Sequence, residues 1–301
     1  MTPRPDPAVA PPMAAAAGEA WLRDRPVADV LAQAAGENFP VAAAFLPRPV
    51  GAHLRALYGY ARLVDDLGDE APGDRSAALD VLAADLERVW TTGSPELPVL
   101  AALVPTVRAC ALPPEPFRDL LAANRADQTT TRYATFDELL AYCRLSADPV
   151  GRLVLGVFGA TTPERVALSD RVCTALQLFE HWQDVGEDYR RGRVYLPGED
   201  LRRFGVTGRD LGEPAAGSAL RRLLAFEVGR ARDLLDAGTP LVATLRGTAR
   251  LAVAGFVGGG RAAQEAIVRA GYDVLGRPTV PRRHRVARHA LAVLLARASS
   301  R

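Results

Sequence analysis

The residues of this chain that could do chemistry lie in two acidic segments. One segment, residues 179–197, reads "FEHWQDVGEDYRRGRVYLP", and the other, residues 58–70, reads "YGYARLVDDLGDE". If both segments are helical, their polar side chains recur every third or fourth residue and share one face of each helix. The two polar stripes are Gln177, Glu180, Asp184 and Asp188 on one helix and Tyr58, Arg62, Asp65 and Asp69 on the other.

Each stripe is either solvated surface or the wall of an interior cavity. A solvated face is the common role of a single Asp-x-x-x-Asp pattern. Two features favour a cavity here. Carboxylates four residues apart repel one another unless a cation compensates them, and both helices are apolar beside their stripes. The flanking side chains are Leu54, Leu57, Leu63 and Val64 on one helix and Val172, Leu176, Leu178 and Phe179 on the other.

Buried carboxylates of one sign need a cation, and all the candidate ligands here offer oxygen. The five carboxylates are Asp65, Asp69, Glu180, Asp184 and Asp188. Oxygen-only ligands favour Mg²⁺, which keeps water in its shell and bridges to substrate phosphate oxygens. His181 lies one position off the stripe, where a packed or hydrogen-bonded histidine is the commoner role. We therefore expect a Mg²⁺ site with carboxylates on both walls.

Arginines beside the two stripes would complete a diphosphate site, because a guanidinium binds phosphate oxygens in a bidentate manner. These arginines are Arg62, Arg190, Arg191 and Arg193. Metal and arginine would stabilise a departing diphosphate, and dry apolar walls would protect the resulting carbocation from water. The pattern predicts an enzyme that ionises a carbon–oxygen bond of an isoprenoid diphosphate.

Helical periodicity over most of the chain provides the elements that must position the stripes. We expect helices at residues 49–68, 77–90, 98–111, 115–126, 136–145, 164–190, 219–237, 240–256 and 261–274. Alternating strand patterns are nearly absent, and no linker separates halves of different composition. Gly258-Gly259-Gly260 has neither a preceding strand nor the spacing of a phosphate loop, so it favours a helix break. The sequence predicts one all-α domain.

Composition narrows the class of protein. The chain has 301 residues, of which 49% are hydrophobic and 6% aromatic, and its net charge is +2. This charge and aromatic content give no support to nucleic-acid binding. Cys110, Cys143 and Cys173 lack the spacing of a disulfide frame or zinc site and are typical of buried thiols in a reducing cytoplasm.

The N-terminal residues 1–22 are rich in proline and alanine, and we expect a disordered leader before a domain at 23–301. This leader lacks the apolar core of a signal peptide. No apolar run reaches the roughly 18 residues that a membrane span needs. We expect a cytoplasmic protein, and a peripheral contact with the membrane stays open.

At these residues the chain resembles the squalene/phytoene synthase family, whose all-α fold faces two aspartate-rich helices across a central cavity. The resemblance runs from about residue 26 to 285 and rests on "YGYARLVDDLGDE", "ALQLFEHWQDVGEDYRRGRVYLP" and "GYDVLGRP". The family pattern implies two sets of residues. The metal–diphosphate ligands are Asp65, Asp69, Asp184 and Asp188, and the substrate contacts are Tyr58, Arg62 and Gln177.

Two further segments resemble one branch of this family, the hydroxysqualene synthases of bacterial hopanoid pathways. These are "ENFPVAAAFLPRPV" at 37–50 and "YCRLSADPVGRLVLGVFG" at 142–159. Leu145 stands where squalene synthases have a tyrosine that is associated with their first half-reaction, the condensation of two farnesyl diphosphates. The resemblance therefore implies an enzyme that receives presqualene diphosphate ready made. Ser146 and Asp148 are candidates for lining a water route, although Asp148 also fits a helix start.

The chain departs from the family pattern at Glu180, where an asparagine is usual. Glutamate can still bind Mg²⁺, and we expect it to do so; the alternative is an ion pair with an arginine. The expected reaction is ionisation of presqualene diphosphate and capture by water, with Arg62 and Arg193 on the diphosphate and Tyr58 and Gln177 at the reacting centre.

Two rival functions remain open. One is a head-to-head prenyltransferase that uses farnesyl or geranylgeranyl diphosphate to make presqualene diphosphate, squalene or phytoene. The other is a non-catalytic assembly or scaffold member of the family, against which the intact stripes argue. The sequence leaves open the oligomeric state and whether a sister presqualene diphosphate synthase hands over the substrate.

Overall fold

The computed structural model describes residues 12–32, 46–276 and 279–296. Two predicted features lie wholly or partly outside these ranges: the start of the leader, residues 1–11, and most of the motif at 37–50. The described residues form α-helices without a strand, apart from an isolated bridge between Arg132 and Val194. The all-α prediction is confirmed.

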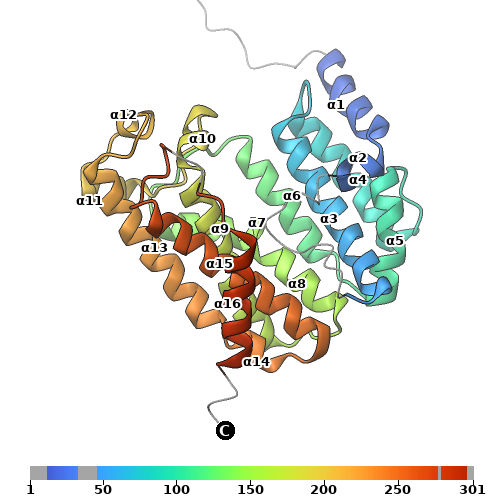
Figure 1. The fold of residues 1–301 in the computed structure, drawn as a ribbon. Helices are drawn as coiled ribbons and strands as arrows, with labels where there is room; N and C mark the ends of the chain where they lie inside the picture. The colour runs from blue at the N-terminus through green and yellow to red at the C-terminus, as the bar shows by residue number, and fades with distance from the viewer. Residues whose placement is uncertain (1–11, 33–45, 277–278, 297–301) are drawn as a thin grey trace, which may run out of the picture.

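Figure 1 shows how these helices are arranged along the chain. In chain order they are α1 (Pro12–Asp24), α2 (Val27–Ala32), α3 (Arg48–Asp69), α4 (Arg75–Thr91), α5 (Pro98–Cys110), α6 (Glu115–Asp127), α7 (Phe136–Ser146), α8 (Asp148–Val157), α9 (Pro163–Gln183), α10 (Val185–Arg190), α11 (Gly198–Phe204), α12 (Gly208–Leu211), α13 (Ser218–Gly238), α14 (Leu241–Thr244), α15 (Gly247–Arg269) and α16 (Arg283–Leu295). None of these helices is long and apolar enough to cross a membrane.

Buried apolar side chains form two clusters, and α8 contributes to both. The N-terminal cluster includes Tyr60 of α3, whose hydroxyl donates a 2.7 Å hydrogen bond to the carbonyl oxygen of Phe117. The C-terminal cluster includes Trp182 of α9. On α8, Leu153 belongs to the first cluster and Leu155 to the second. Figure 1 shows α8 between the N-terminal helices and the orange and red C-terminal helices.

The predicted helix over 164–190 is two helices, α9 and α10, which meet at Asp184. Asp184 has φ −100° and ψ 12°, outside the helical region. Its backbone N–H still donates to the Glu180 carbonyl at 3.0 Å, and the Asp188 N–H donates to the Asp184 carbonyl at 2.8 Å. The acidic stripe therefore continues across the break.

The predicted helix break at Gly258-Gly259-Gly260 is wrong, because all three glycines lie inside α15. A Cβ on Gly258 would lie 2.7 Å from the Val286 carbonyl oxygen and 2.7 Å from the Ala290 nitrogen of α16. Glycine is needed here because the backbones of α15 and α16 approach so closely. The predicted helices at 240–256 and 261–274 therefore give way to α14 and α15.

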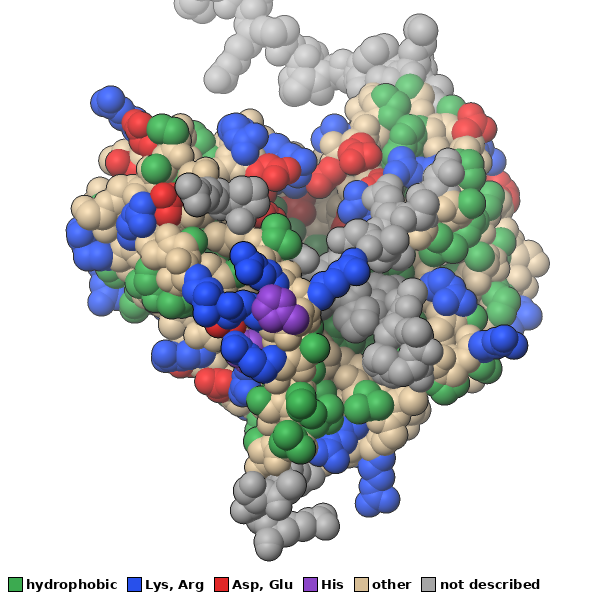
Figure 2. All heavy atoms as spheres, in the orientation of Figure 1, with side chains coloured by type: hydrophobic (Ala, Val, Ile, Leu, Met, Phe, Trp, Pro, Cys, Tyr) green, Lys and Arg blue, Asp and Glu red, His purple; other side chains and the backbone are tan. Residues whose placement is uncertain are grey.

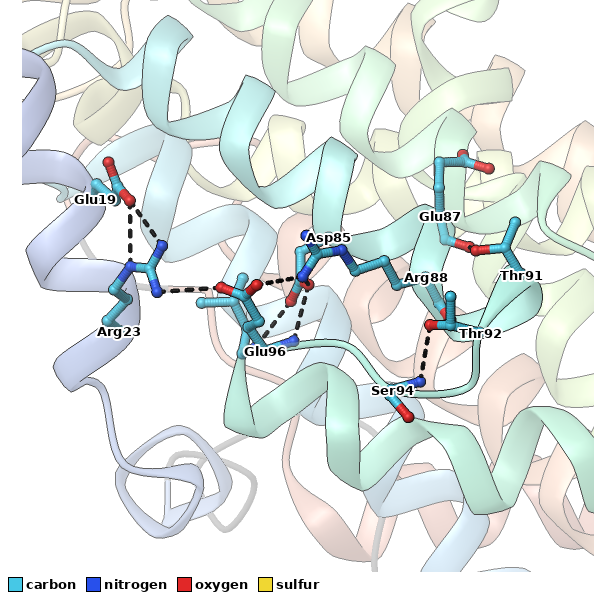
Figure 3. Close-up of polar contacts among 10 residues, drawn as sticks. Glu19, Arg23, Asp85, Glu87, Arg88, Thr91, Thr92, Ser94 and Glu96 are labelled. Atoms are coloured by element: carbon cyan, nitrogen blue, oxygen red, sulfur yellow. Dashed lines mark hydrogen bonds and ion pairs between the residues drawn. The ribbon is translucent and has the colours of Figure 1, made fainter.

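The predicted leader over residues 1–22 is wrong in its second half, because Pro12–Asp24 forms α1. Leu22 is buried, and the Arg23 guanidinium lies 3.3 Å from the Glu96 carboxylate (Figure 3). The Asp85 carboxylate accepts the backbone N–H of Glu96 at 2.8 Å in the same network. These contacts join α1 to the connection between α4 and α5.

The three cysteines carry free thiols, as expected. Cys143 is buried, and Cys110 and Cys173 are half-buried. Burial raises the pKa of the Cys143 and Cys173 thiols to about 12, so both stay protonated at neutral pH.

Candidate active site

A cavity of about 290 Å³ opens between the two apolar clusters and is lined by residues of α3, α6, α8, α9 and α15, among others. Much of its wall is apolar; examples are Leu54, Leu57, Leu153, Val172, Leu176 and Phe256. Five predicted site residues lie together in its lining: Tyr58, Arg62 and Asp65 from α3, and Gln177 and Glu180 from α9. The two stripes thus face one apolar cavity from opposite clusters.

Asp65 is exposed in the cavity lining, and α6 supplies a partner for it. The Asn124 amide Nδ2 donates to Asp65 Oδ1 at 3.3 Å. Loss of hydration raises the pKa of Asp65 to about 7; the Asn124 hydrogen bond opposes this rise. Gly68 permits the approach of α6, because a Cβ there would lie 2.3 Å from the Asn124 side-chain oxygen. Asn124 is a site residue that sequence reasoning did not identify.

Asp66, one residue further along α3, has a different environment. It is 1% exposed and forms ion pairs with two arginines, Arg25 and Arg62. The Arg62 Nε lies 2.7 Å from Asp66 Oδ1, and the Arg25 guanidinium also stacks over the Trp21 ring at 4.3 Å. Arg62 therefore reaches the cavity with its position fixed from behind. The four-residue spacing of Arg62 and Asp66 is the signal that sequence reasoning missed.

Arg193 connects the two stripes. Its guanidinium lies 2.8 Å from the carboxylate of Asp69 on α3, and its backbone N–H donates to the Asp188 carbonyl at 2.8 Å. Burial raises the pKa of Asp188 to about 7, and the neighbouring Asp184 adds to the rise. These four residues lie outside the cavity lining, at the end of the stripes.

The other two arginines of the predicted diphosphate site contact α10 itself. Arg190 is exposed and donates from Nε to the Gly186 carbonyl at 3.1 Å. Arg191 is exposed and lies 2.8 Å from the Glu187 carboxylate. The structure therefore brings Arg62 and Arg193 to the stripes and leaves Arg190 and Arg191 outside the cavity lining.

Aromatic packing fixes His181 and, through it, Gln177. The His181 ring stacks on Tyr195 with a centroid distance of 3.7 Å, and its Nε2 lies 3.3 Å from the Gln177 amide nitrogen. Burial lowers the pKa of His181 to about 3, so the ring is neutral at neutral pH. The packed, hydrogen-bonded role expected for His181 agrees with this geometry. Tyr142, which also contacts Tyr195, donates to Asp127 at 2.7 Å.

The donor chemistry of the stripes fits a hard divalent cation. Asp65 and Asp69 supply one pair of carboxylates and Asp184 and Asp188 the other, on separate helices. Among the described residues, no three carboxylate, imidazole or thiol side chains converge into a closed metal site. Open carboxylate pairs suit a cation that completes its shell with water and substrate oxygens, as Mg²⁺ does.

Ser146 and Asp148, the two candidates for lining a water route, lie on either side of the junction between α7 and α8 and have different surroundings. Ser146 lines the cavity. Asp148 is buried outside the lining, where it accepts a 2.8 Å hydrogen bond from the Thr174 hydroxyl and begins α8. Asp148 therefore fits the alternative of a helix start. The Leu145 side chain packs against the C-terminal apolar cluster.

Most of the chain resembles known proteins. A family model, squalene/phytoene synthase, matches residues 32–285. The hydroxysqualene synthase of Rhodopseudomonas palustris is 38% identical over 70% of this chain and 72% of its own length. The phytoene synthase of Mycobacterium bovis is 32% identical over 72% of each chain. The crystal structure of squalene synthase HpnC from Alicyclobacillus acidocaldarius superposes with a TM-score of 0.76 at 44% identity, covering 82% of this chain and 93% of that one.

Proposed function

The chain belongs to the squalene/phytoene synthase family, and we propose that it ionises presqualene diphosphate and adds water to give hydroxysqualene and diphosphate. The observation that carries this proposal is the cavity itself. An apolar chamber meets Arg62, Asp65 and Glu180 in one continuous lining, and Ser146 adds a hydroxyl. Relatives named hydroxysqualene synthase support this branch of the family.

The carboxylates would hold Mg²⁺, which lowers the barrier to ionisation by neutralising the leaving diphosphate. Asp65 and Asp69 would bind it from α3, and Asp184 and Asp188 from the junction of α9 and α10. Glu180 would add a further oxygen from the cavity wall. Burial disfavours the charged forms of Asp65 and Asp188, so a bound cation would stabilise the charges that these side chains need.

Arg62 and Arg193 would bind the diphosphate in different ways. Arg62 is already held by the buried Asp66 and would present its free N–H groups to the phosphate oxygens without reorganising. Arg193 pairs with Asp69, which is itself a proposed ligand. It would have to leave Asp69 for the diphosphate when the cation takes its place. Substrate binding is thereby coupled to cation binding.

Ionisation leaves a carbocation in a cavity whose walls offer few nucleophiles. Tyr58 and Gln177 line it near the acidic residues, and His181 holds the Gln177 amide in place. The apolar remainder excludes most water and so delays quenching until the cation has rearranged. A single admitted water then supplies the hydroxyl group and loses a proton. Ser146 lines the cavity, and its buried hydroxyl has no hydrogen-bond partner among the described residues, so it would be available to bind that water.

The choice of substrate rests on Leu145. Closing a cyclopropane between two farnesyl units requires a group that accepts a proton, and leucine cannot do this. Presqualene diphosphate must then come from a separate condensing enzyme. The head-to-head prenyltransferase remains the second candidate, because the solved relative at 44% identity is called a squalene synthase. A non-catalytic scaffold is disfavoured, since nothing would maintain two complete carboxylate pairs.

The test is to incubate the purified enzyme and Mg²⁺ with farnesyl, geranylgeranyl or presqualene diphosphate and to identify each product by mass. We expect consumption of presqualene diphosphate alone, with incorporation of one ¹⁸O atom from labelled water. Squalene or presqualene diphosphate formed from farnesyl diphosphate would replace this proposal with the prenyltransferase. Failure to consume any of the three would support the scaffold.

A further inference from the structure

The outward face of α16 has an unusual composition for a solvent-exposed helix. His284, Arg288, Leu291 and Leu295 recur at spacings of four, three and four residues and are all exposed. Leu291 and Leu295 are 55% and 56% exposed. We call these four residues the α16 face. Figure 2 shows basic and histidine side chains over the first half of α16 and apolar side chains over its end.

The opposite side of α16 holds the helix to the body of the protein. Glu265 of α15 pairs with Arg285 and lies 3.0 Å from the His289 ring nitrogen, and Arg288, at the edge of the α16 face, also reaches Glu265 at 2.8 Å. Val293 is buried, and the Arg250 guanidinium donates to the Leu294 carbonyl at 3.0 Å. The inner side therefore supplies the packing, and Leu291 and Leu295 are not members of either apolar cluster.

The side chains of α16 itself carry charge of one sign, and Glu265 of α15, which contacts Arg285, Arg288 and His289, is the acidic residue that pairs with this helix in the described part of the chain. The chain contains no aspartate or glutamate after Asp273. Arg282 and Arg283, at the start of α16, are exposed, and no salt bridge to either occurs in the described part of the chain. Basic side chains followed by exposed leucines on one helix are typical of a segment that lies in a membrane interface.

We propose that the α16 face docks on an anionic lipid surface. Arg282 and Arg283, at the start of the helix, would bind headgroup phosphates. Leu291 and Leu295 would enter the boundary between headgroups and acyl chains. A second copy of the chain is a poorer occupant, because pairing two such faces would bring Arg282 and Arg283 of both copies together, and Glu265 is already paired with Arg285 and Arg288. The binding of lipid is independent of which isoprenoid diphosphate the enzyme uses.

The start of α16 lies close to the cavity, which suggests why a membrane contact at this helix would serve the enzyme. The segment before it is anchored to α9, where the Gln183 amide donates to the Thr279 carbonyl. Pro281 shares a small recess with Gln183 and Glu180, and Glu180 also lines the large cavity. A bilayer bound at α16 would therefore lie near the cavity that holds the isoprenoid chain. An isoprenoid product that is insoluble in water would have a short path to lipid.

The experiment measures flotation of the full chain with vesicles of phosphatidylglycerol and, separately, of phosphatidylcholine. We expect binding to the anionic vesicles that weakens as salt is raised, and at least about tenfold weaker binding to the neutral ones. Arg282→Gln with Arg283→Gln should weaken binding about 25-fold, because each basic residue near an anionic surface contributes about fivefold. The matched control is Arg202→Gln with Arg222→Gln on α11 and α13, which makes the same change of charge.

The apolar contribution has its own variants. Leu291→Ser with Leu295→Ser should reduce vesicle binding at least about tenfold, whereas Leu291→Met with Leu295→Met should retain it. All variants should keep the wild-type melting temperature, since these side chains lie outside the core. Equal binding by the serine and methionine variants would overturn the proposal. So would a wild-type dimer that the serine variant converts to a monomer, because α16 would then be a contact between copies.

Discussion

Replacing Asp66 or Asp65 with asparagine separates two neighbouring carboxylates that the fold uses differently. Asp66 is 1% exposed and pairs with Arg25 and Arg62, whose side chains are 17% and 30% exposed. Asp65 forms no ion pair in the described residues and opens to the cavity. Both substitutions replace a carboxylate with an amide of the same size. A difference in stability or activity between the two variants therefore reflects the different surroundings of Asp65 and Asp66.

The expected loss for Asp66→Asn is about 3 kcal/mol of unfolding free energy. Removing one partner of a buried ion pair costs about 3–5 kcal/mol, and the lower end applies because both arginines keep some contact with solvent. A loss of this size corresponds to a fall in melting temperature of roughly 6 °C, at about 2 °C per kcal/mol for a large domain. Asp65→Asn should cost no stability, because the Asn124 amide can still donate to the new side-chain oxygen.

The effects on activity should be the reverse of those on stability, with the larger loss of turnover for Asp65→Asn. Asp65→Asn should abolish most turnover in saturating Mg²⁺, because a proposed metal ligand is lost. Asp66→Asn should raise KM more than it lowers kcat, because Arg62 loses the carboxylate that orients it. The assays are thermal unfolding by circular dichroism in EDTA and initial rates with presqualene diphosphate. An unchanged melting temperature for Asp66→Asn would refute the reasoning about the buried pair, and near-wild-type turnover for Asp65→Asn would refute the metal assignment.

Three further substitutions test separate parts of the molecule. Glu180→Asn should keep activity but raise the Mg²⁺ concentration needed, and an unchanged requirement would show that Glu180 is no ligand. Gly258→Ala should cost about 1–3 kcal/mol in chemical denaturation, because its Cβ meets the α16 backbone at 2.7 Å; wild-type stability would contradict that contact. Burial raises the pKa of Glu227 to about 8 from 4.5, so stability should fall as pH rises between these values, where only the unfolded chain has released the proton. Glu227→Gln should flatten that fall in melting temperature, and an identical pH profile would contradict it.

The sequence was sufficient for the parts of the fold that follow helical periodicity. The apolar flanks of Asp65 and Asp184 indicated interior stripes, and this held only in part: five of the eight stripe residues line the cavity, whereas Asp69, Asp184 and Asp188 lie outside its lining. It failed where tertiary contact overrides local preference. The glycines at 258–260 were interpreted as a helix break because they lack the context of a phosphate loop, but the close approach of α16 requires glycine at position 258 inside a helix. The helix α16 itself was missed because most of its surface is basic or exposed.

Partner choice within the site was the other limit of sequence reasoning. A stripe read as one helix face cannot show that Arg62 is held by a residue off that face. Asp66 projects about 100° away from Asp65 on the same helix, and Arg25 reaches it from the connection between α1 and α2. Likewise, Asn124 comes from α6, about sixty residues further along the chain, and meets Asp65 only because Gly68 lets the helices approach.

The two arginines of the proposed diphosphate site, Arg62 and Arg193, differ in the exposure of the carboxylates that they pair with. The carboxylate of Asp66 is 1% exposed, so releasing Arg62 would leave a buried charge without compensation. The carboxylate of Asp69 is 43% exposed, so solvent or a cation can replace Arg193 at small cost. One pair is therefore structural and the other exchangeable. Under the proposed function the two arginines would therefore act differently: Arg62 would be fixed in place to receive the substrate, and Arg193 would be released by the cation to follow it.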